Sequence, residues 1–305
     1  MWHKARAWLR ALATQSLLPG VLVSCNNGVG FLPGTDTGTL SLRVTDAPAD
    51  QAVEIVVDFA GVEVKPEDDD PFILDIEPDR PVELLALRAG ATVAILPERE
   101  VPAGRYEWIR LIVNARPDVQ DDSFVQLATG ERFPLVIRSG DGAGLRVERP
   151  FTVSEGEHVE LVADFDLRRS VLAPPGGAGT NWFFVPVVRV VDGRNVGAIA
   201  GRVDPLLVDA QCTPFVYVFE GAGVPPDDLD DDPGFGPLTS VPVTTIGPGG
   251  LPEYRVSFLE PGDYTVSFTC DGAADDPQTN DFVSFDVTVN ATVSANETTI
   301  VDLES

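Results

Sequence analysis

The chain has 305 residues and a formal net charge of −27, from 21 basic and 48 acidic residues. So acidic a surface repels nucleic acid and anionic lipid, and we expect no nucleic-acid partner. The two histidines are His3 and His158, and His3 lies in a segment expected to be removed, which excludes a zinc site with two or three histidines from one mature chain.

Residues 1–24 have the pattern of a bacterial lipoprotein signal peptide. Three basic residues and no acid accompany a mostly apolar stretch over 11–23, which is too short to span a membrane. The stretch ends in Leu-Val-Ser-Cys at 22–25, which resembles the lipobox, whose cysteine receives diacylglycerol before cleavage. We therefore expect cleavage between Ser24 and Cys25, acyl chains on Cys25 and anchoring in a membrane. The alternative is an ordinary signal peptide with a chance cysteine.

The residues after Cys25 predict where the anchored protein resides. Asn26 follows the cysteine, and an aspartate at that position tends to retain Gram-negative lipoproteins at the inner membrane. The asparagine therefore favours the outer membrane. Residues 25–38 are rich in Gly, Asn and Thr and have no periodicity, which predicts a flexible tether between the lipid and the body.

Residues 39–192 are predicted to form a β-rich domain. Apolar and polar residues alternate over short segments separated by Pro and Gly, which places one face of each strand in a core. The expected strands cover 40–45, 53–59, 72–76, 108–113, 124–127, 133–137, 158–166 and 183–191, with one helical turn over 82–87. Many short antiparallel strands favour a sandwich or barrel.

One expected strand carries the titratable residues that suggest chemistry. Asp164 and Asp166 lie two positions apart on one face, which His158 shares, and Arg168 and Arg169 follow at once. Paired carboxylates could act as acid and base. The adjacent arginines and the lack of a nucleophile favour a structural Asp–Arg network instead, and we interpret His158 as structural or solvent-facing.

Seven segments of this domain carry a family resemblance through their order and spacing. They are LSLRVTDAPAD (40–50), VVDFAGVEV (56–64), ELLALRAG (83–90), VPAGRYEWIRLIV (101–113), GLRVERPFTV (144–153), LVADFDLRRSV (161–171) and VPVVRVV (185–191). This region resembles the bacterial lipoprotein domain known as domain of unknown function 4382. The resemblance implies a β-rich envelope lipoprotein without established activity, so it supplies no catalytic residues.

A linker at 193–196 separates a second predicted domain, 197–305. Alternation resumes over 215–219, 254–259, 264–269, 282–289 and 298–303, and the Pro-Gly pair at 261–262 predicts a tight reversal. The segments GAIAGRV, YRVSFLEPGDYTVSF and VTVNATVSANETTIVDL resemble the carboxypeptidase-regulatory or transthyretin-like sandwich. That resemblance implies seven strands and a supporting or binding role. The predicted fold class is therefore all-β, with two β-sandwich domains of the immunoglobulin-like or prealbumin-like kind.

Cysteines and an acidic stretch are the remaining candidate sites of the second domain. In an oxidising envelope Cys212 and Cys270 predict a disulfide, the alternative being two buried free thiols. A Pro- and Gly-rich loop over 224–237 holds Asp227, Asp228, Asp230, Asp231 and Asp232. Carboxylates suit calcium, but their order lacks the EF-hand pattern. We therefore interpret the loop as solvated and expect no cofactor, with calcium binding as the alternative.

These observations favour a lipid-anchored, non-catalytic envelope protein that presents a binding or scaffolding surface to another envelope protein or a glycan. No nucleophile elbow, histidine-rich zinc motif or phosphate-binding loop is visible. Trp108, Trp182 and Tyr217 could stack on sugar rings, although strand aromatics more often lie in a core. The alternatives are a glycan-binding or calcium-dependent adhesin-like surface protein and, less favoured, a hydrolase that uses Asp164 and Asp166.

Overall fold

The computed structural model describes residues 36–305 except 48–51, 118, 120, 138–143, 175–180, 231–235 and 246–249. The predicted signal peptide, the cleavage site at Ser24 and Cys25, and most of the predicted tether lie outside the described residues. No helix in the described part is long and apolar enough to cross a membrane.

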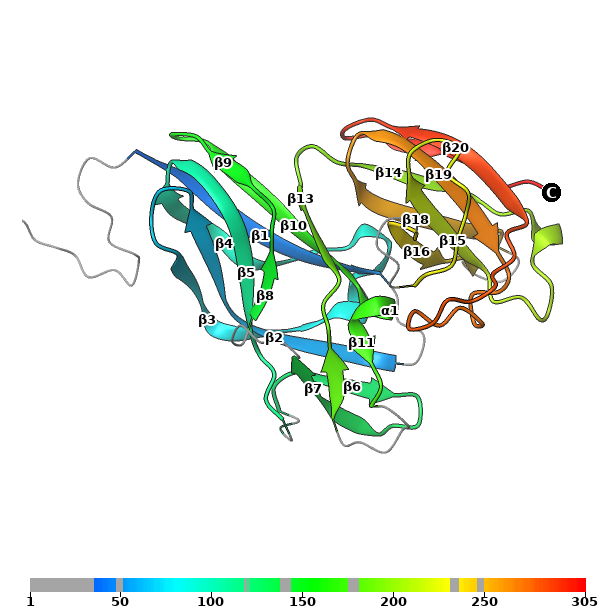
Figure 1. Ribbon diagram of the computed structural model, residues 1–305, viewed down its shortest axis with the longest axis horizontal. Helices are drawn as coiled ribbons and strands as arrows, with labels where there is room; N and C mark the ends of the chain where they lie inside the picture. Colours follow the sequence, from blue (N-terminus) through cyan, green and yellow to red (C-terminus); the bar gives the residue numbers. More distant parts are fainter. Residues whose placement is uncertain are drawn as a thin grey trace, which may run out of the picture. The chain divides into compact units, whose positions relative to one another are not determined.

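The first half of the chain forms two β-sheets, here called the first sheet pair (Figure 1). One sheet has the order β13 (Val188–Asp192), β10 (His158–Asp166), β1 (Thr37–Ala47) and β4 (Val93–Pro102), with β1 parallel to β10. The other has the order β11 (Val171–Leu172), β12 (Trp182–Phe184), β7 (Arg132–Ile137), β6 (Phe124–Leu127), β2 (Ala52–Pro66), β5 (Gly104–Asn114) and β8 (Gly144–Val147). In addition, β3 (Phe72–Glu83) pairs with β2, and β9 (Phe151–Val153) pairs with β5.

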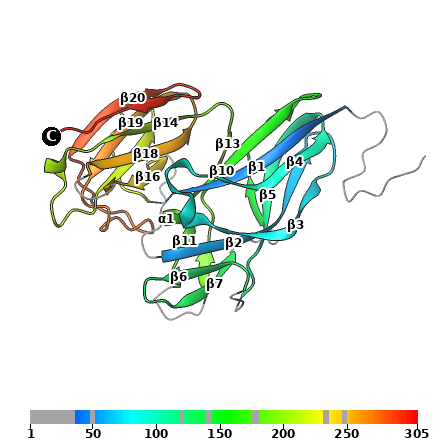
Figure 2. The ribbon, with the colours of Figure 1, turned by 180° about the vertical axis from the view of Figure 1, so that it is seen from behind.

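The second half forms two four-stranded sheets, the second sheet pair (Figure 2). Their orders are β17 (Thr244–Thr245), β18 (Pro252–Leu259), β14 (Gly197–Arg202), β21 (Thr298–Ile300), and β16 (Thr239–Pro242), β15 (Phe215–Glu220), β19 (Gly262–Thr269), β20 (Val287–Val293). The all-β, two-sandwich fold class is therefore confirmed. The division into two domains stays a prediction, because residues 33–305 group as one compact unit.

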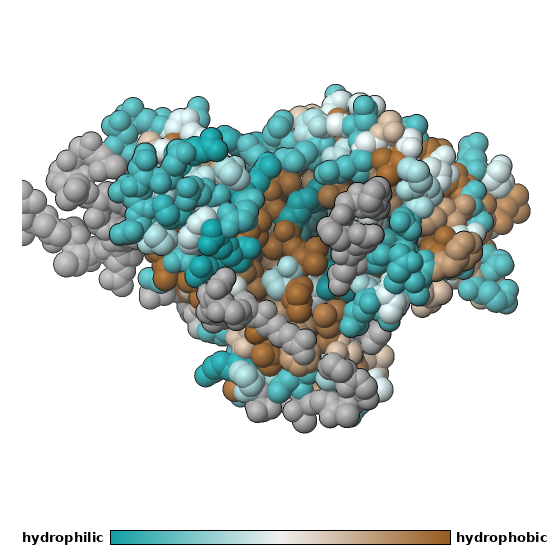
Figure 3. Space-filling view, viewed as in Figure 1, coloured by the Kyte–Doolittle hydropathy of each residue, from teal (hydrophilic) through white to brown (hydrophobic). Residues whose placement is uncertain are grey.

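The predicted alternation places the expected side chains in the core. Leu40, Leu42 and Val44 of β1 are fully buried in the cluster that fills the first sheet pair. A separate cluster fills the second sheet pair and includes Val216 and Val266. Hydrophilic residues cover much of the face in Figure 3, as the net charge of −27 leads one to expect.

Several predicted elements differ from the structure. The single strand expected over 183–191 is wrong, because β12 and β13 belong to different sheets. Pro186 lies between them and has no amide hydrogen to continue a ladder. The expected strand over 282–289 begins only at Val287, and Phe282 is 93% exposed. The helical turn expected over 82–87 is the 3-10 segment η1 (Leu84–Gly90).

The two sheet pairs share a plan that our sequence analysis missed. The segment TVSEGE (152–157) turns from β9 to β10, and TVSANE (292–297) turns from β20 to β21. In the first turn the backbone oxygen of Glu157 accepts a hydrogen bond from the amide of Thr39 at 2.9 Å. In the second turn the backbone oxygen of Glu297 accepts one from the amide of Ala198, also at 2.9 Å. Each turn therefore holds the opening strand of its own sheet pair.

A tyrosine occupies equivalent positions in the two sheet pairs, each time where the chain crosses from one sheet to the other. The chain passes from β4 to β5 and from β18 to β19, in each case between the two sheets of a pair. The hydroxyl of Tyr106 donates to the oxygen of Pro102 at 2.8 Å, and that of Tyr264 donates to Glu260 at 2.7 Å. The predicted reversal at Pro261 is thus a crossing between sheets, fixed by a tyrosine corner.

Arg168 connects the first sheet pair to the second. It lies on the short helix α1 (Leu167–Ser170), and its side chain is 1% exposed. The guanidinium donates to the hydroxyls of Tyr217 at 3.0 Å and Ser240 at 3.1 Å, and to the backbone oxygens of Gly272 at 3.1 Å and Asp275 at 3.0 Å. Its carboxylate partner is Asp275, 3.2 Å away.

Candidate functional site

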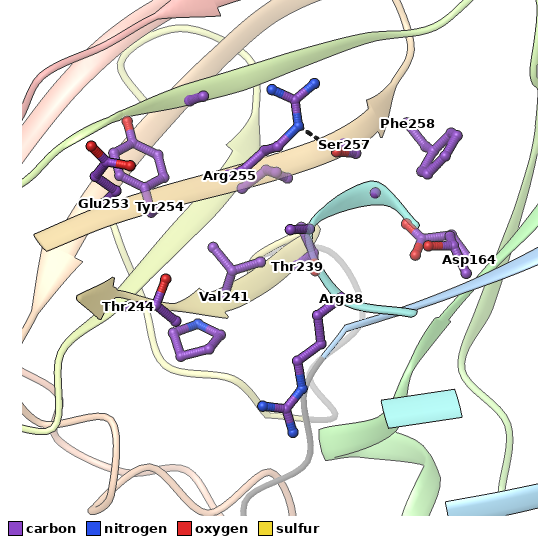
Figure 4. A pocket seen from close by; sticks show the side chains of 16 residues that line it. Arg88, Asp164, Thr239, Val241, Thr244, Glu253, Tyr254, Arg255, Ser257 and Phe258 are labelled. Carbon is purple, nitrogen blue, oxygen red and sulfur yellow. Dashed lines mark hydrogen bonds between the residues drawn. The ribbon is translucent and has the colours of Figure 1, made fainter. Parts of the chain in front are cut away.

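A cavity of about 320 Å³ is the candidate binding site (Figure 4). The end of η1, strand β16 and strand β18 contribute most of its lining. Apolar side chains such as Val241 and Val256 line it together with the hydroxyls of Thr239, Thr244 and Ser257. Small-molecule sites usually have this volume or more and combine an apolar lining with a few polar groups.

Charges of both signs surround this cavity. Arg88, Asp164, Glu253 and Arg255 are all part of its lining (Figure 4). The Nε of Arg255 donates to the hydroxyl of Ser257 at 3.2 Å. A serine becomes a nucleophile beside a base, and a guanidinium cannot serve as one. The guanidinium therefore holds this hydroxyl without activating it.

The backbone beside the cavity is held in an uncommon conformation. Ala89 and Phe258, which line the cavity, have φ angles of 60° and 58°, and Gly90, which also lines it, has a φ angle of 86°. A Cβ on Gly90 would lie 2.5 Å from the hydroxyl oxygen of Ser257, so η1 approaches β18 closely, and the positive φ of Gly90 also favours glycine there. Left-handed conformations cost about 1–3 kcal/mol at residues other than glycine and are concentrated at functional sites.

Asp164 and Asp166 each have an arginine partner, but only one of the two predicted partners is right. Asp166 accepts from Arg169 at 2.9 Å, as the structural Asp–Arg network requires. Asp164 accepts from Arg189 on the neighbouring strand β13 at 2.5 Å. Arg168, expected in the same network, turns to Asp275 instead.

His158 belongs to a small polar cluster. Its ring nitrogens lie 2.9 Å from the hydroxyl of Thr39 and 3.1 Å from that of Ser41. The carboxylate of Glu98 is 3.8 Å away. The ring is partly exposed, and the hydroxyls of Thr39 and Ser41 hold it against β1.

Most of the first sheet pair matches a known family model. Residues 37–186 match the family model of a domain of unknown function, DUF4382. The DUF4382 region begins with β1 and includes β12, while β13 and the second sheet pair lie beyond it. The predicted resemblance is therefore confirmed for this region. None of the curated proteins matches the chain.

Three solved structures illustrate how distant the structural likenesses are. A leucine-rich repeat protein from Bacteroides thetaiotaomicron is 13% identical, with 89% of this chain and 26% of that chain covered and a TM-score of 0.21. The TIE protein of Bacillus anthracis is 12% identical, with 88% and 34% covered and a TM-score of 0.19. The minor pilin GBS52 of Streptococcus agalactiae is 10% identical, with 87% and 94% covered and a TM-score of 0.20. The chain spans about a quarter and about a third of the first two.

The three aromatic residues suggested for sugar stacking are buried. Trp108 and Trp182 lie in the DUF4382 region, and Tyr217 lies on β15 with no exposed surface. The guanidinium of Arg146 covers the ring of Trp108 at 4.4 Å from its centroid. Sugar stacking on these three rings is thus wrong, because their faces pack against other side chains.

The predicted disulfide between Cys212 and Cys270 is present. It links the segment before β15 to the end of β19, and the backbone of Thr213 pairs with that of Asp271 just beyond it. The disulfide therefore fixes the start of the loop that follows β19.

Two described residues of the acidic stretch, Asp228 and Asp230, are buried or hydrogen-bonded. Asp231 and Asp232 lie outside the described residues, and Asp227 is exposed. Asp230 accepts from the amide of Asn280 at 3.0 Å, whereas Asp228 is buried. The solvated interpretation is therefore wrong for Asp228. The neighbours of Asp228 are Asp275 and Asp281, which lie in the loop after β19 and belong to no pattern that predicts a site.

Proposed function

We propose that this protein is a bacterial envelope lipoprotein, anchored in the outer membrane through Cys25, that binds an envelope glycan without catalysis. Support for the anchor comes from the lipobox-like residues 22–25 and from Asn26. The first strand begins at Thr37, so the tether proposed for residues 25–38 precedes it almost entirely. Two or more acyl chains are enough for stable anchoring.

The strained backbone beside the cavity carries the proposed binding role. Ala89 and Phe258 come from elements distant in the sequence, yet both adopt left-handed conformations at the same cavity. Such strain persists only where the surrounding structure enforces it, and it fixes the shape of a site in advance of binding.

The cavity lining favours a sugar residue as the bound group. The hydroxyl of Thr239 can donate to and accept from sugar hydroxyls, and the carboxylate of Glu253 can accept from them. Arg88 and Arg255 can donate to ring or carboxylate oxygens. The apolar lining suits the C–H faces of a sugar. A partly open cavity of about 320 Å³ fits a small group better than the flat surface of a protein partner.

We further assign the second sheet pair to the carboxypeptidase-regulatory or transthyretin-like sandwiches. Its two-layer arrangement and the tyrosine corner at Tyr264 support this assignment. The two four-stranded sheets hold eight strands, so the implied number of seven is wrong. In this proposal the second sheet pair has a binding role, because β16 and β18 form most of the cavity wall.

Calorimetric titration with oligosaccharides released from bacterial envelopes tests the proposed function. Thr244→Trp places a large side chain at the cavity lining, and Thr152→Trp places the same group at an exposed position of β9, outside the cavity. We expect the wild type and Thr152→Trp to bind equally, and Thr244→Trp to bind at least about tenfold more weakly, or about 1.4 kcal/mol. Undiminished binding by Thr244→Trp, or no binding by the folded wild type, would contradict the proposal.

A further inference from the structure

Two loops at one edge of the second sheet pair are fastened to each other. One loop joins β15 to β16, and the other joins β19 to β20. The amide of Leu229 donates to Asp275 at 3.1 Å, and the amide of Asp281 donates to Asp228. The contacts run in both directions between the loops, so the acidic side chains at their junction have fixed neighbours.

Three carboxylates meet at this junction. Asp228, Asp275 and Asp281 each offer an oxygen, and these oxygens all lie within 4.8 Å of one another. Calcium binds carboxylate oxygens at about 2.4 Å, so two ligands of one ion are at most about 4.8 Å apart. The spacing is therefore that of oxygens that share one ion.

The protein balances only part of this charge. Asp275 is paired with Arg168 and also accepts from Tyr217. Asp228 is 1% exposed, and its Oδ1 is buried without a hydrogen-bond partner. We find no ion-pair partner for Asp228 among the described residues. An ionised carboxylate that is buried without a counter-charge is costly.

Other buried carboxylates show how unusual Asp228 is. Asp58, Glu63 and Asp122 also hold a buried oxygen without a hydrogen-bond partner. Glu63 is nevertheless paired with Arg110 at 3.1 Å, and Asp122 with Arg116 at 3.0 Å. Asp58 accepts from the amide of Asn114 at 3.0 Å. The other carboxylate oxygen of Asp228 accepts from the backbone amide of Asp281, but within the described residues no arginine or side-chain amide pairs with this carboxylate as in the other three.

We propose that Asp228, Asp275 and Asp281 form a calcium site that joins the two loops. The ligands are all carboxylate oxygens, without histidine or cysteine, which favours a hard cation over zinc or copper. Their origin in two irregular loops suits calcium, which tolerates irregular geometry, better than magnesium, which demands a near-octahedral arrangement. The site is separate from the cavity of the proposed function and does not depend on it.

Calorimetric and thermal measurements on the full chain, freed of metal with a chelator, test this site. CaCl₂ is titrated to about 10 mM, beyond the weakest range of extracellular calcium modules, with MgCl₂ in parallel. We expect one calcium per chain, weaker binding of magnesium, and a calcium-dependent rise in Tm. Asp228→Asn should bind calcium at least about tenfold more weakly. In the chelator it should melt above the wild type, because it no longer buries an uncompensated charge.

Two further variants show whether a change in calcium affinity comes from the proposed site. Asp227→Asn removes an exposed charge one position away and should leave calcium affinity nearly unchanged. Asp281→Asn is the second test variant should Asp228→Asn fail to fold, and it should lose affinity by a similar factor. The proposal is overturned if the folded wild type gives neither heat nor a Tm shift. It is equally overturned if magnesium binds as tightly as calcium, if Asp281→Asn and Asp228→Asn retain full affinity, or if Asp227→Asn alone loses it.

Discussion

The guanidinium of Arg168 lies 3.2 Å from the carboxylate of Asp275, and both side chains are buried. The arginine comes from the helix after β10, and the aspartate comes from the loop after β19. The same guanidinium lies 4.7 Å from the centroid of the Phe215 ring. One side chain of the first sheet pair thus organises polar and aromatic groups of the second.

Replacing Arg168 by alanine should destabilise the protein strongly. The change leaves Asp275 buried without its counter-charge, which typically costs about 3–5 kcal/mol. Arg149→Ala is the matched control, because Arg149 also joins the two sheet pairs, through Glu260 at 2.6 Å, but both partners are exposed. That pair should contribute at most about 1 kcal/mol. Urea unfolding measures both, and equal losses would refute the central position of Arg168.

All four tyrosines should resist ionisation while the protein is folded. Burial is the largest cause that raises the pKa of Tyr106, Tyr217, Tyr254 and Tyr264 above the ordinary value. The folded state therefore keeps protons that the unfolded state releases near pH 10. This contribution to stability is fully present below about pH 10 and is lost as the pH rises further.

Absorbance at 295 nm measures tyrosinate directly. In the folded protein it should stay flat through about pH 10 and then rise together with unfolding, whereas the protein in denaturant should titrate near pH 10. A tyrosine that ionises near pH 10 while circular dichroism stays native would show that the hydroxyls are accessible.

The repeated turn should make Gly197 intolerant of a side chain. A Cβ there would lie 2.3 Å from the backbone oxygen of Ser294, as one on Gly38 would lie 2.5 Å from that of Ser154. Gly197→Ala should therefore cost about 1–3 kcal/mol through overpacking. At Gly262 the nearest atom to an added Cβ is 3.9 Å away, so Gly262→Ala should change stability little. Thermal unfolding compares the two, and a neutral Gly197→Ala would contradict the tight turn.

The disulfide should stabilise the second sheet pair substantially. Its cysteines are 58 positions apart, and closing a loop of that length in the unfolded chain contributes about 4 kcal/mol. Reduction of the wild type and the Cys212→Ser, Cys270→Ser double variant should lower the unfolding free energy by similar amounts. Should a reductant leave the urea midpoint of the wild type unchanged, the bond would not have this role.

Many strands could be predicted from the sequence, because a strand buried on one face alternates apolar and polar residues. Leu40, Leu42 and Val44 predicted β1 correctly for that reason. Strand β4 was missed, since its central residues Pro97 and Glu98 interrupt the alternation. The repeated TVSEGE and TVSANE segments were visible in the sequence. Their structural role could not be predicted, because each packs against a glycine far away along the chain, Gly38 or Gly197.

The functional residues were harder to predict because they depend on contacts between distant segments. No local pattern links Arg168 to Asp275, whose backbone oxygen it also binds across 107 positions. The sequence presents Asp228 only as one of five aspartates in an acidic stretch. Its burial involves a contact with Asp281 from another irregular loop, which no local pattern predicts. Ala89 and Phe258 carry no sequence signal for a left-handed conformation, since neither is a residue that favours it.

Mass spectrometry of the N-terminal peptide, with labelled palmitate uptake, tests the lipid anchor most directly. The protein is expressed in a bacterium that processes lipoproteins, and the wild type is compared with Cys25→Ser. The account predicts a mature chain that begins at acylated Cys25, incorporates palmitate and sediments with outer membranes, while Cys25→Ser is unlabelled and leaves the membrane fraction. An unlabelled wild type, or a Cys25→Ser protein that still sediments with membranes, would contradict it.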